Sequence, residues 1–149
     1  MRSAKRAAPL LVVAWMLFIF GTSSTVVLPR QLFRFMRDRV LRDDGLSERF
    51  EVFWGLAWFA IVKSWHATEF ALLFLFCFWA LARWRPARRA ANVTLAIAVA
   101  LLFAAADEWH QTFVPGRGGN VIDVLIDSLG VLVASLAILS CGRPKVNPQ

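Results

Sequence analysis

The sequence predicts an all-α membrane protein: a bundle of four transmembrane helices, with an amphipathic segment at the membrane interface between the first and second. Three observations support this fold class. The 149 residues are 58% apolar, the apolar residues form runs of membrane-spanning length, and most basic residues stand between those runs. About 20 apolar residues cross the hydrocarbon core as a helix. The length suits one domain, so residues 1–149 are expected to form a single transmembrane domain.

The first predicted span covers about residues 10–28 and follows a short basic head. The hydroxyl residues near its end include Ser23 and Ser24, whose side chains can bond back to helix carbonyls, so we expect the helix to continue through them. A basic start followed by an apolar centre is also typical of a secretory signal. Because apolar residues resume after the hydroxyls, we interpret the segment as a retained span.

Residues 29–51 mix basic, acidic and apolar side chains. The apolar ones recur at helical spacing, which predicts a short helix lying in the membrane interface. They are Leu32, Phe33, Met36 and Val40. A turn is expected at Asp44 and Gly45, and Ser47 is a candidate cap for the helix that follows.

The second span lies in an apolar run over 52–82, which is longer than one crossing. We expect 61–82 to cross the membrane and the preceding part to tilt or lie in the interface, anchored by Trp54 and Trp58. Two further spans are predicted at about 92–112 and 121–141, joined by a tight turn.

The orientation is predicted from lysine and arginine in the short loops. With the N-terminus inside, nine basic residues fall in the inside segments and seven in the outside ones. We therefore place both termini in the cytoplasm. The basic excess between apolar runs indicates anionic lipid headgroups as partners. Nucleic acid is excluded, because no basic face with interleaved aromatic residues lies outside the spans.

Polar and ionisable residues interrupt three of the four predicted spans. Each costs about 2.5–3.5 kcal/mol at the centre of a bilayer, so an ionisable residue there indicates a functional site. In the predicted orientation they all fall toward the outer side, and spacings of three and four residues place those of one helix on a shared face. They are Lys63, His66 and Glu69 in the second span; Asp107, Glu108 and Gln111 in the third; Asp123 and Asp127 in the fourth.

The turn between the last two spans carries Arg117, Gly118 and Gly119. Arg117 and Lys63 are the fixed positive charges in this cluster of polar residues, which also contains five carboxylates. Such an excess of acid cannot stay buried and ionised without partners. Some acids are then protonated, or a histidine is charged, or a cation is bound, or the site is wet.

The polar positions form an ordered pattern: Lys63-x-x-His66-x-x-Glu69, then Asp107-Glu108-x-x-Gln111, a turn with Gly116-Arg117, and Asp123-x-x-x-Asp127-x-x-Gly130. In this pattern the sequence resembles the VanZ-like family of bacterial membrane proteins. Asp127 stands where the family often has Asn. The family name comes from a member linked to low-level resistance to teicoplanin, so the resemblance implies a multi-pass protein of the bacterial cytoplasmic membrane with a role in the cell envelope.

Four interpretations of the cluster remain open. In the first, it binds or modifies a phosphate-bearing lipid or a lipid-linked cell-wall precursor from the outer leaflet. Arg117 would clamp the phosphate, with backbone donors from Gly118 and Gly119 and a point charge from Lys63. His66 or Glu108 would act as general base, oriented by Asp123 or Asp127. The sequence leaves open whether the protein is an enzyme, and it indicates no cofactor.

The other three interpretations need no lipid ligand. A structural network would pair Lys63 with Asp107 or Glu108, and Asp123 with Arg117. A metal site would use the histidines and carboxylates, although no HExxH motif is present and no metal ligands are assigned. Proton-coupled transport would use the chain of acids, although no inverted repeat is visible. The sequence does not give the oligomeric state.

Overall fold

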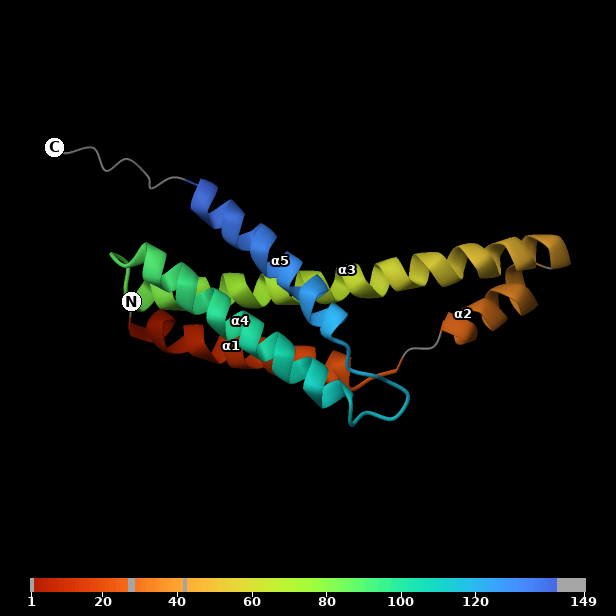
Figure 1. Cartoon of the computed structure of the whole chain (residues 1–149), viewed down its shortest axis with the longest axis horizontal. Helices are drawn as coiled ribbons and strands as arrows, with labels where there is room; N and C mark the ends of the chain where they lie inside the picture. The colour runs from red at the N-terminus through yellow and green to blue at the C-terminus, as the bar shows by residue number, and fades with distance from the viewer. Residues whose placement is uncertain (1, 27–28, 42, 142–149) are drawn as a thin grey trace.

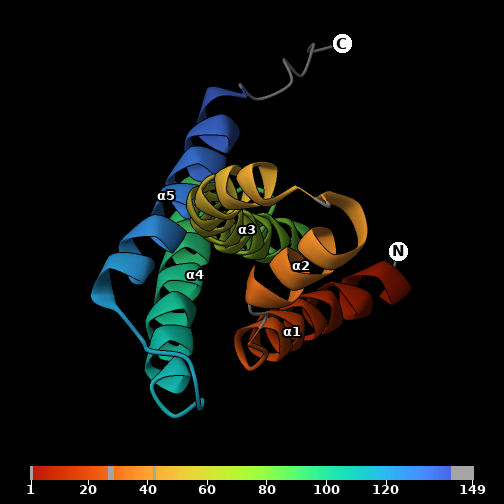
Figure 2. The ribbon, with the colours of Figure 1, turned by 90° about the vertical axis from the view of Figure 1, so that its right-hand side faces the viewer.

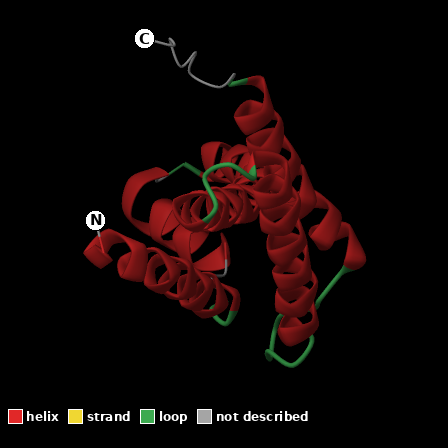
Figure 3. Ribbon diagram, turned by 90° about the vertical axis from the view of Figure 1, so that its left-hand side faces the viewer, coloured by secondary structure: helices red, strands yellow, loops and turns green. Residues whose placement is uncertain are grey.

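The computed structural model describes residues 2–26, 29–41 and 43–141. Every element in these ranges is helical, and short loops join them (Figure 3). The predicted all-α class is therefore confirmed. The elements are α1 (Arg2–Ser23), α2 (Pro29–Met36), the π-helical η1 (Arg37–Leu41), α3 (Asp44–Trp84), α4 (Arg89–Gln111) and α5 (Val121–Ser140).

Three of these helices, α3, α4 and α5, are long and apolar enough to cross a membrane, and α1 contains the shorter apolar stretch Ala7–Ser23. The starts and ends of α4 and α5 lie close to those predicted for the third and fourth spans. The composition and length of these helices indicate a membrane protein. A crossing by α1, and so a total of four, stays a prediction.

The first helix ends at Ser23, so the predicted end at residue 28 is wrong; residues 27 and 28 lie outside the described ranges. The hydroxyls of Thr22, Ser24 and Thr25 do bond back to α1 carbonyls. The helix nevertheless ends at Ser23. The Arg117 guanidinium donates to the carbonyl oxygen of Thr22 in its last turn and to that of Thr25 just beyond it. Helix-end carbonyls have no partner within the helix and are free to accept such donors.

The second predicted span is part of a much longer helix. α3 runs unbroken for 41 residues, or about 60 Å at a rise of about 1.5 Å per residue, twice the thickness of the hydrocarbon core. Its first half extends beyond the other long helices (Figure 1). The turn expected at Asp44 and Gly45 is wrong, since both lie in the first turn of α3. The cap is Asp43, whose Oδ1 accepts from the Leu46 N–H at 2.8 Å, and Ser47 is buried inside the helix.

The amphipathic segment forms α2 and η1, which fold back along the first half of α3 (Figure 1). An aromatic ladder joins them: the ring centroids of Phe33 and Phe50 are 6.5 Å apart, those of Phe50 and Trp54 5.8 Å, and those of Trp54 and Trp58 5.7 Å. The predicted short helix is thus present. Its place at the membrane interface remains a prediction.

α3 is the central helix of the bundle. Looking along it, Figure 2 shows α1 and α2 on one side and α4 and α5 on the other. Phe70, Leu73 and Phe74 of α3 are fully buried. On α4, three fully buried alanines four residues apart let the helices approach closely. These are Ala96, Ala100 and Ala104.

α3 and α5 approach each other closely at Gly130. A Cβ at this position would lie 1.8 Å from the Ala67 carbonyl oxygen, so only glycine fits. This contact places the polar residues of α5 beside those of α3. The end of the bundle away from the α4–α5 turn holds the start of α1, the α3–α4 connection and the end of α5 (Figure 1).

Candidate functional site

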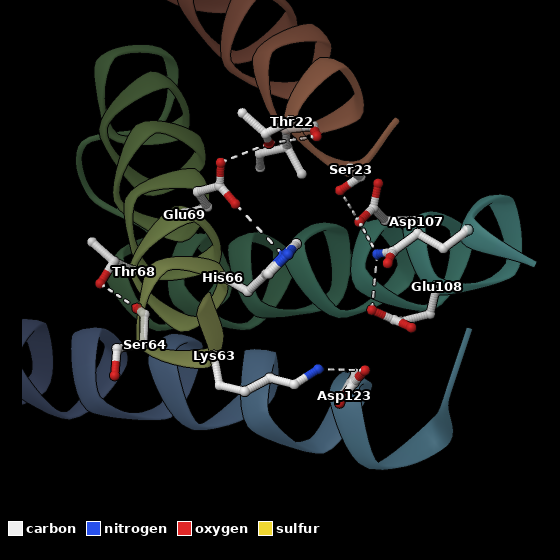
Figure 4. Close-up of polar contacts among 12 residues, drawn as sticks. Thr22, Ser23, Lys63, Ser64, His66, Thr68, Glu69, Asp107, Glu108 and Asp123 are labelled. Carbon is white, nitrogen blue, oxygen red and sulfur yellow. Dashed lines mark hydrogen bonds and ion pairs between the residues drawn. The ribbon is translucent and has the colours of Figure 1, made fainter. Parts of the chain in front are cut away.

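The predicted polar residues meet where α1 and α4 end, α5 begins and α3 passes through its midpoint (Figure 4). The four acids Glu69, Asp107, Glu108 and Asp127 are nearly inaccessible to solvent. The acids therefore face the bundle interior, as a lipid-facing position would be prohibitive. The structure brings all eight predicted polar residues of the spans together, and their functional roles stay predictions.

The end of α4 is fixed by hydrogen bonds to both neighbouring segments. Asp107 Oδ2 accepts from Ser23 Oγ at 2.6 Å and from Gln111 Nε2 at 3.0 Å. Glu108 accepts at Oε1 from the same Gln111 nitrogen and at Oε2 from the Asn120 backbone N–H, both at 3.0 Å. These bonds connect α4 to α1 on one side and to the start of α5 on the other.

Arg117 connects the α4–α5 turn to α1. It donates to Gln111 Oε1 at 3.1 Å, to the Thr22 carbonyl at 3.2 Å and to the Thr25 carbonyl at 2.7 Å. A guanidinium has five N–H donors, so two remain for a ligand. The structural interpretation expected Asp123 as the partner of Arg117, and this pairing is wrong.

Lys63 instead forms the ion pair with Asp123. Its Nζ lies 2.5 Å from Asp123 Oδ2, and both side chains are about four-fifths buried, at 22% and 18% exposed. The expected pairing of Lys63 with Asp107 or Glu108 is therefore wrong. The reason is helix rotation: Asp107 and Glu108 point toward α1 and the turn, whereas Asp123 faces Lys63 across the α3–α5 contact (Figure 4).

His66 and Glu69 form a second pair on α3. Nδ1 of His66 lies 3.6 Å from Glu69 Oε2, and neither atom has a hydrogen-bond partner among the described residues. Glu69 Oε1 accepts from Thr22 Oγ1 at 2.8 Å. The carboxylate beside His66 is therefore Glu69, which corrects the expectation that Asp123 or Asp127 orients it.

A cavity of about 640 Å³ opens beside this cluster. Its polar lining includes Lys63, His66, Glu108, Gln111, Arg117, Asp123 and Asp127. Its apolar wall comes from Val26 and from α3, where Ile61 and Trp65 are half exposed. The cavity thus combines charged groups with an apolar side that reaches the surface of a candidate span.

The glycines of the turn have distinct environments. Gly116 has a φ of +82°, a conformation that L side chains rarely adopt, and it precedes Arg117. Gly118 lines the cavity. A Cβ on Gly119 would lie 2.0 Å from the Glu108 carbonyl oxygen, so the chain can pass the end of α4 only without a side chain there.

The sequence interpretation missed the contribution of α1 to the cluster. The Thr22 hydroxyl donates to the Glu69 carboxylate, and the Ser23 hydroxyl donates to the Asp107 carboxylate. Trp15 Nε1 donates to the Glu69 carbonyl oxygen at 2.9 Å. The run Thr22-Ser23-Ser24-Thr25 at the end of an apolar stretch was the available signal. Asn120, which caps α5 with its Oδ1, was also missed.

Among the described residues, no group of three or more histidine, cysteine or carboxylate side chains is arranged to hold a metal ion. Four of the carboxylates instead bond to hydroxyl, amide and ammonium groups of the chain; these are Glu69, Asp107, Glu108 and Asp123. Cys77 is a free, buried thiol and Cys141 a free, exposed one.

The helices and the cluster define a class: an α-helical membrane protein whose spans enclose a charged cavity near one end. The family model described as VanZ/LLP1 matches residues 7–142. The chain therefore belongs to the VanZ/LLP1 family, as its pattern of polar residues suggested. No curated protein and no solved structure matches it.

Proposed function

We propose that the cavity binds the phosphate-bearing headgroup of a membrane amphiphile, a phospholipid or a lipid-linked cell-wall precursor, reached from the outer leaflet. The observation that carries the proposal is the composition of the cavity wall. Lys63 and the unused N–H groups of Arg117 can bind phosphate oxygens. Trp58, Ile61, Val62 and Trp65 form an apolar side on which an acyl or prenyl chain can lie.

The location supports an amphiphile over a soluble anion. The apolar wall belongs to α3, a helix long and apolar enough to span a membrane, and Ile61 and Trp65 on it are half exposed. Basic residues gather at the other end of the bundle, including Arg83, Arg85, Arg88 and Arg89. Because basic loops favour the cytoplasm, the proposal places that end inside and the cavity toward the exterior.

Native mass spectrometry tests the proposal directly. The delipidated full-length protein is incubated with a total bacterial lipid extract, and bound species are identified after gentle removal of detergent. We expect about one equivalent of a phosphate-bearing lipid, because the proposal places one headgroup in the charged cavity. Retention of only phosphate-free lipids, such as diacylglycerol or glycolipids, would refute it.

Arg117→Lys tests the role of the guanidinium. A lysine cannot reproduce its fork of donors, so we expect the bound lipid to be lost while membrane abundance is kept. In cells that express the protein, the same variant should abolish any change in teicoplanin susceptibility that the wild type causes. Arg85→Lys, at the opposite end, serves as control. Loss of abundance in Arg117→Lys would favour a purely structural role.

One observation favours a second function, hydrolysis of the phosphate ester. His66 lines the cavity, and buried Glu69 stands beside its Nδ1. A histidine oriented by a carboxylate can accept a proton from water at Nε2. The water oxygen would then bond to phosphorus, the ester P–O bond would break, and the proton would pass to the leaving oxygen. Release of the dephosphorylated lipid by wild type and not by His66→Gln supports this; binding without product supports the binder.

A further inference from the structure

Asp127 lacks a partner in the cluster. It lies on α5 at the wall of the cavity and is 1% exposed, yet its Oδ2 has no hydrogen-bond donor among the described residues. A buried carboxylate oxygen without a hydrogen-bond donor has lost its water and gained nothing in return, which is unfavourable. The close contact of α5 with α3 at Gly130 and Ala67 lies less than one turn further along α5. A ligand that supplies a donor here would remove the cost.

The charges around the cavity show what kind of donor fits. Its wall carries two fixed positive groups, Lys63 and Arg117, and three carboxylates, those of Glu108, Asp123 and Asp127. Lys63 is paired with Asp123. Glu108 accepts neutral N–H donors at both of its oxygens. Each of these oxygens keeps a lone pair, so Glu108 and Asp127 together can accept from a cation.

A phosphate by itself would deepen this excess of negative charge. A headgroup that carries a phosphodiester and a primary ammonium is a zwitterion. It therefore adds no net charge to the cavity. The phosphate would meet Arg117 and Lys63, and the ammonium, with its three N–H donors, would meet the carboxylates.

We propose that the cavity is selective for amphiphiles whose headgroup carries a primary ammonium group beside the phosphate, with Asp127 and Glu108 as the ammonium acceptors. This inference rests on the proposed function. It names the chemical class of the ligand, an aminophospholipid, and it gives the buried carboxylate of α5 a role that phosphate binding alone does not.

The experiment compares two phospholipids that share dioctanoyl chains and differ in headgroup charge. Phosphatidylethanolamine and phosphatidylglycerol are titrated into the full-length protein in detergent, and binding is followed by calorimetry. We expect phosphatidylethanolamine to bind at least about tenfold more tightly. In Asp127→Asn this preference should disappear, because phosphatidylethanolamine loses an ammonium acceptor and the anionic phosphatidylglycerol meets one carboxylate less. Asp38→Asn, an exposed acid of η1, should behave as wild type.

The outcomes separate the two proposals. If neither phospholipid binds, the ammonium inference is wrong, and the proposed function fails as well if native mass spectrometry finds no phosphate-bearing lipid on the protein. If both bind wild type equally, or Asp127→Asn weakens both equally, the ammonium inference is wrong and phosphate binding stands. If Asp127→Asn does not fold, the wild-type protein still tests the ammonium inference. N-acetylated phosphatidylethanolamine, which has no ammonium, should then bind no more tightly than phosphatidylglycerol. Phosphoethanolamine without acyl chains should bind weakly; equal affinity would overturn the assignment to a lipid.

Discussion

Lys63 and Asp123 form an ion pair inside the bundle. Their 2.5 Å ion pair crosses from α3 to α5 with both side chains largely buried. Removing one partner leaves the other charge unpaired, which costs about 3–5 kcal/mol at fully buried sites, and less here because each side chain keeps some exposure. We therefore expect Lys63→Met and Asp123→Leu each to lower stability by about 1–3 kcal/mol.

The double variant distinguishes the pair from two independent contributions. With both charges removed, no unpaired charge remains, so Lys63→Met with Asp123→Leu should recover most of the lost stability. Thermal unfolding in detergent gives the four values of the cycle. Losses that simply add would show that the ion pair does not couple the two helices.

The spacing of the polar residues predicted which of them share a helix face. It did not predict which side chains form pairs between helices. His66 and Glu69 share an α3 face because they are three apart, a relation internal to one helix. The pairing of Lys63 with Asp123 depends on how α3 and α5 are rotated against each other. That rotation is set by the contact of Gly130 with Ala67, which a periodicity cannot reveal.

Among the helix contacts, α5 and α3 lie very close together at Gly130. An alanine Cβ would approach the Ala67 carbonyl oxygen to 1.8 Å, so the helices must separate. We expect Gly130→Ala to destabilise by about 1–3 kcal/mol, the usual cost of overpacking. The melting temperature in detergent measures this.

Gly55→Ala is the matched control for Gly130→Ala. Gly55 also lies within a helix, and a Cβ there has no neighbour within 4 Å. Alanine has the higher helix propensity, by about 1 kcal/mol, so this variant should be neutral or slightly stabilising. Equal destabilisation by both variants would contradict the close approach at Gly130.

The arm formed by α2, η1 and the first half of α3 is held by the aromatic ladder. Phe50 stacks between Phe33 and Trp54, whereas Phe53 is 65% exposed. We expect Phe50→Ala to loosen α2 and η1 and to raise amide hydrogen exchange over residues 29–41. Phe53→Ala should leave that exchange unchanged. The same effect from both would show that the ladder does not hold the arm.

The lengths of the elements were only partly predictable. The apolar runs located α4 and α5 well, because helix and run end together there. Glu48, Arg49 and Glu51 suggested an interface segment before the second span, yet they lie in α3 itself. A continuous helix tolerates polar residues once it leaves the apolar layer, so hydropathy alone cannot find its start.

For the whole molecule, the central expectation is its orientation in the membrane. Both ends of the chain and the α3–α4 connection are predicted to be cytoplasmic, and the cavity to face outward. The exposed thiol of Cys141 should therefore resist a membrane-impermeant maleimide in intact spheroplasts and react after permeabilisation. Buried Cys77 should not react in either state.

A second thiol gives the opposite pattern. Gly118 lies in the α4–α5 turn, and a Cβ there meets nothing within 4 Å. In a Cys141→Ser background, Gly118→Cys should be labelled in intact spheroplasts, whereas Ala87→Cys in the α3–α4 connection should be protected. Reversed labelling would place the cavity on the cytoplasmic side and exclude a ligand from the outer leaflet.

The most direct measurement uses a photocrosslinking residue at the cavity. Benzoylphenylalanine replaces Trp65, which lines the cavity, or Trp109, which is exposed on α4 outside the cavity lining. After irradiation in native membranes, lipid adducts are identified by mass spectrometry. We predict that adducts at position 65 are strongly enriched in one phosphate-bearing lipid class, while those at position 109 follow the bulk membrane. The same bulk composition at both positions would contradict a selective lipid site.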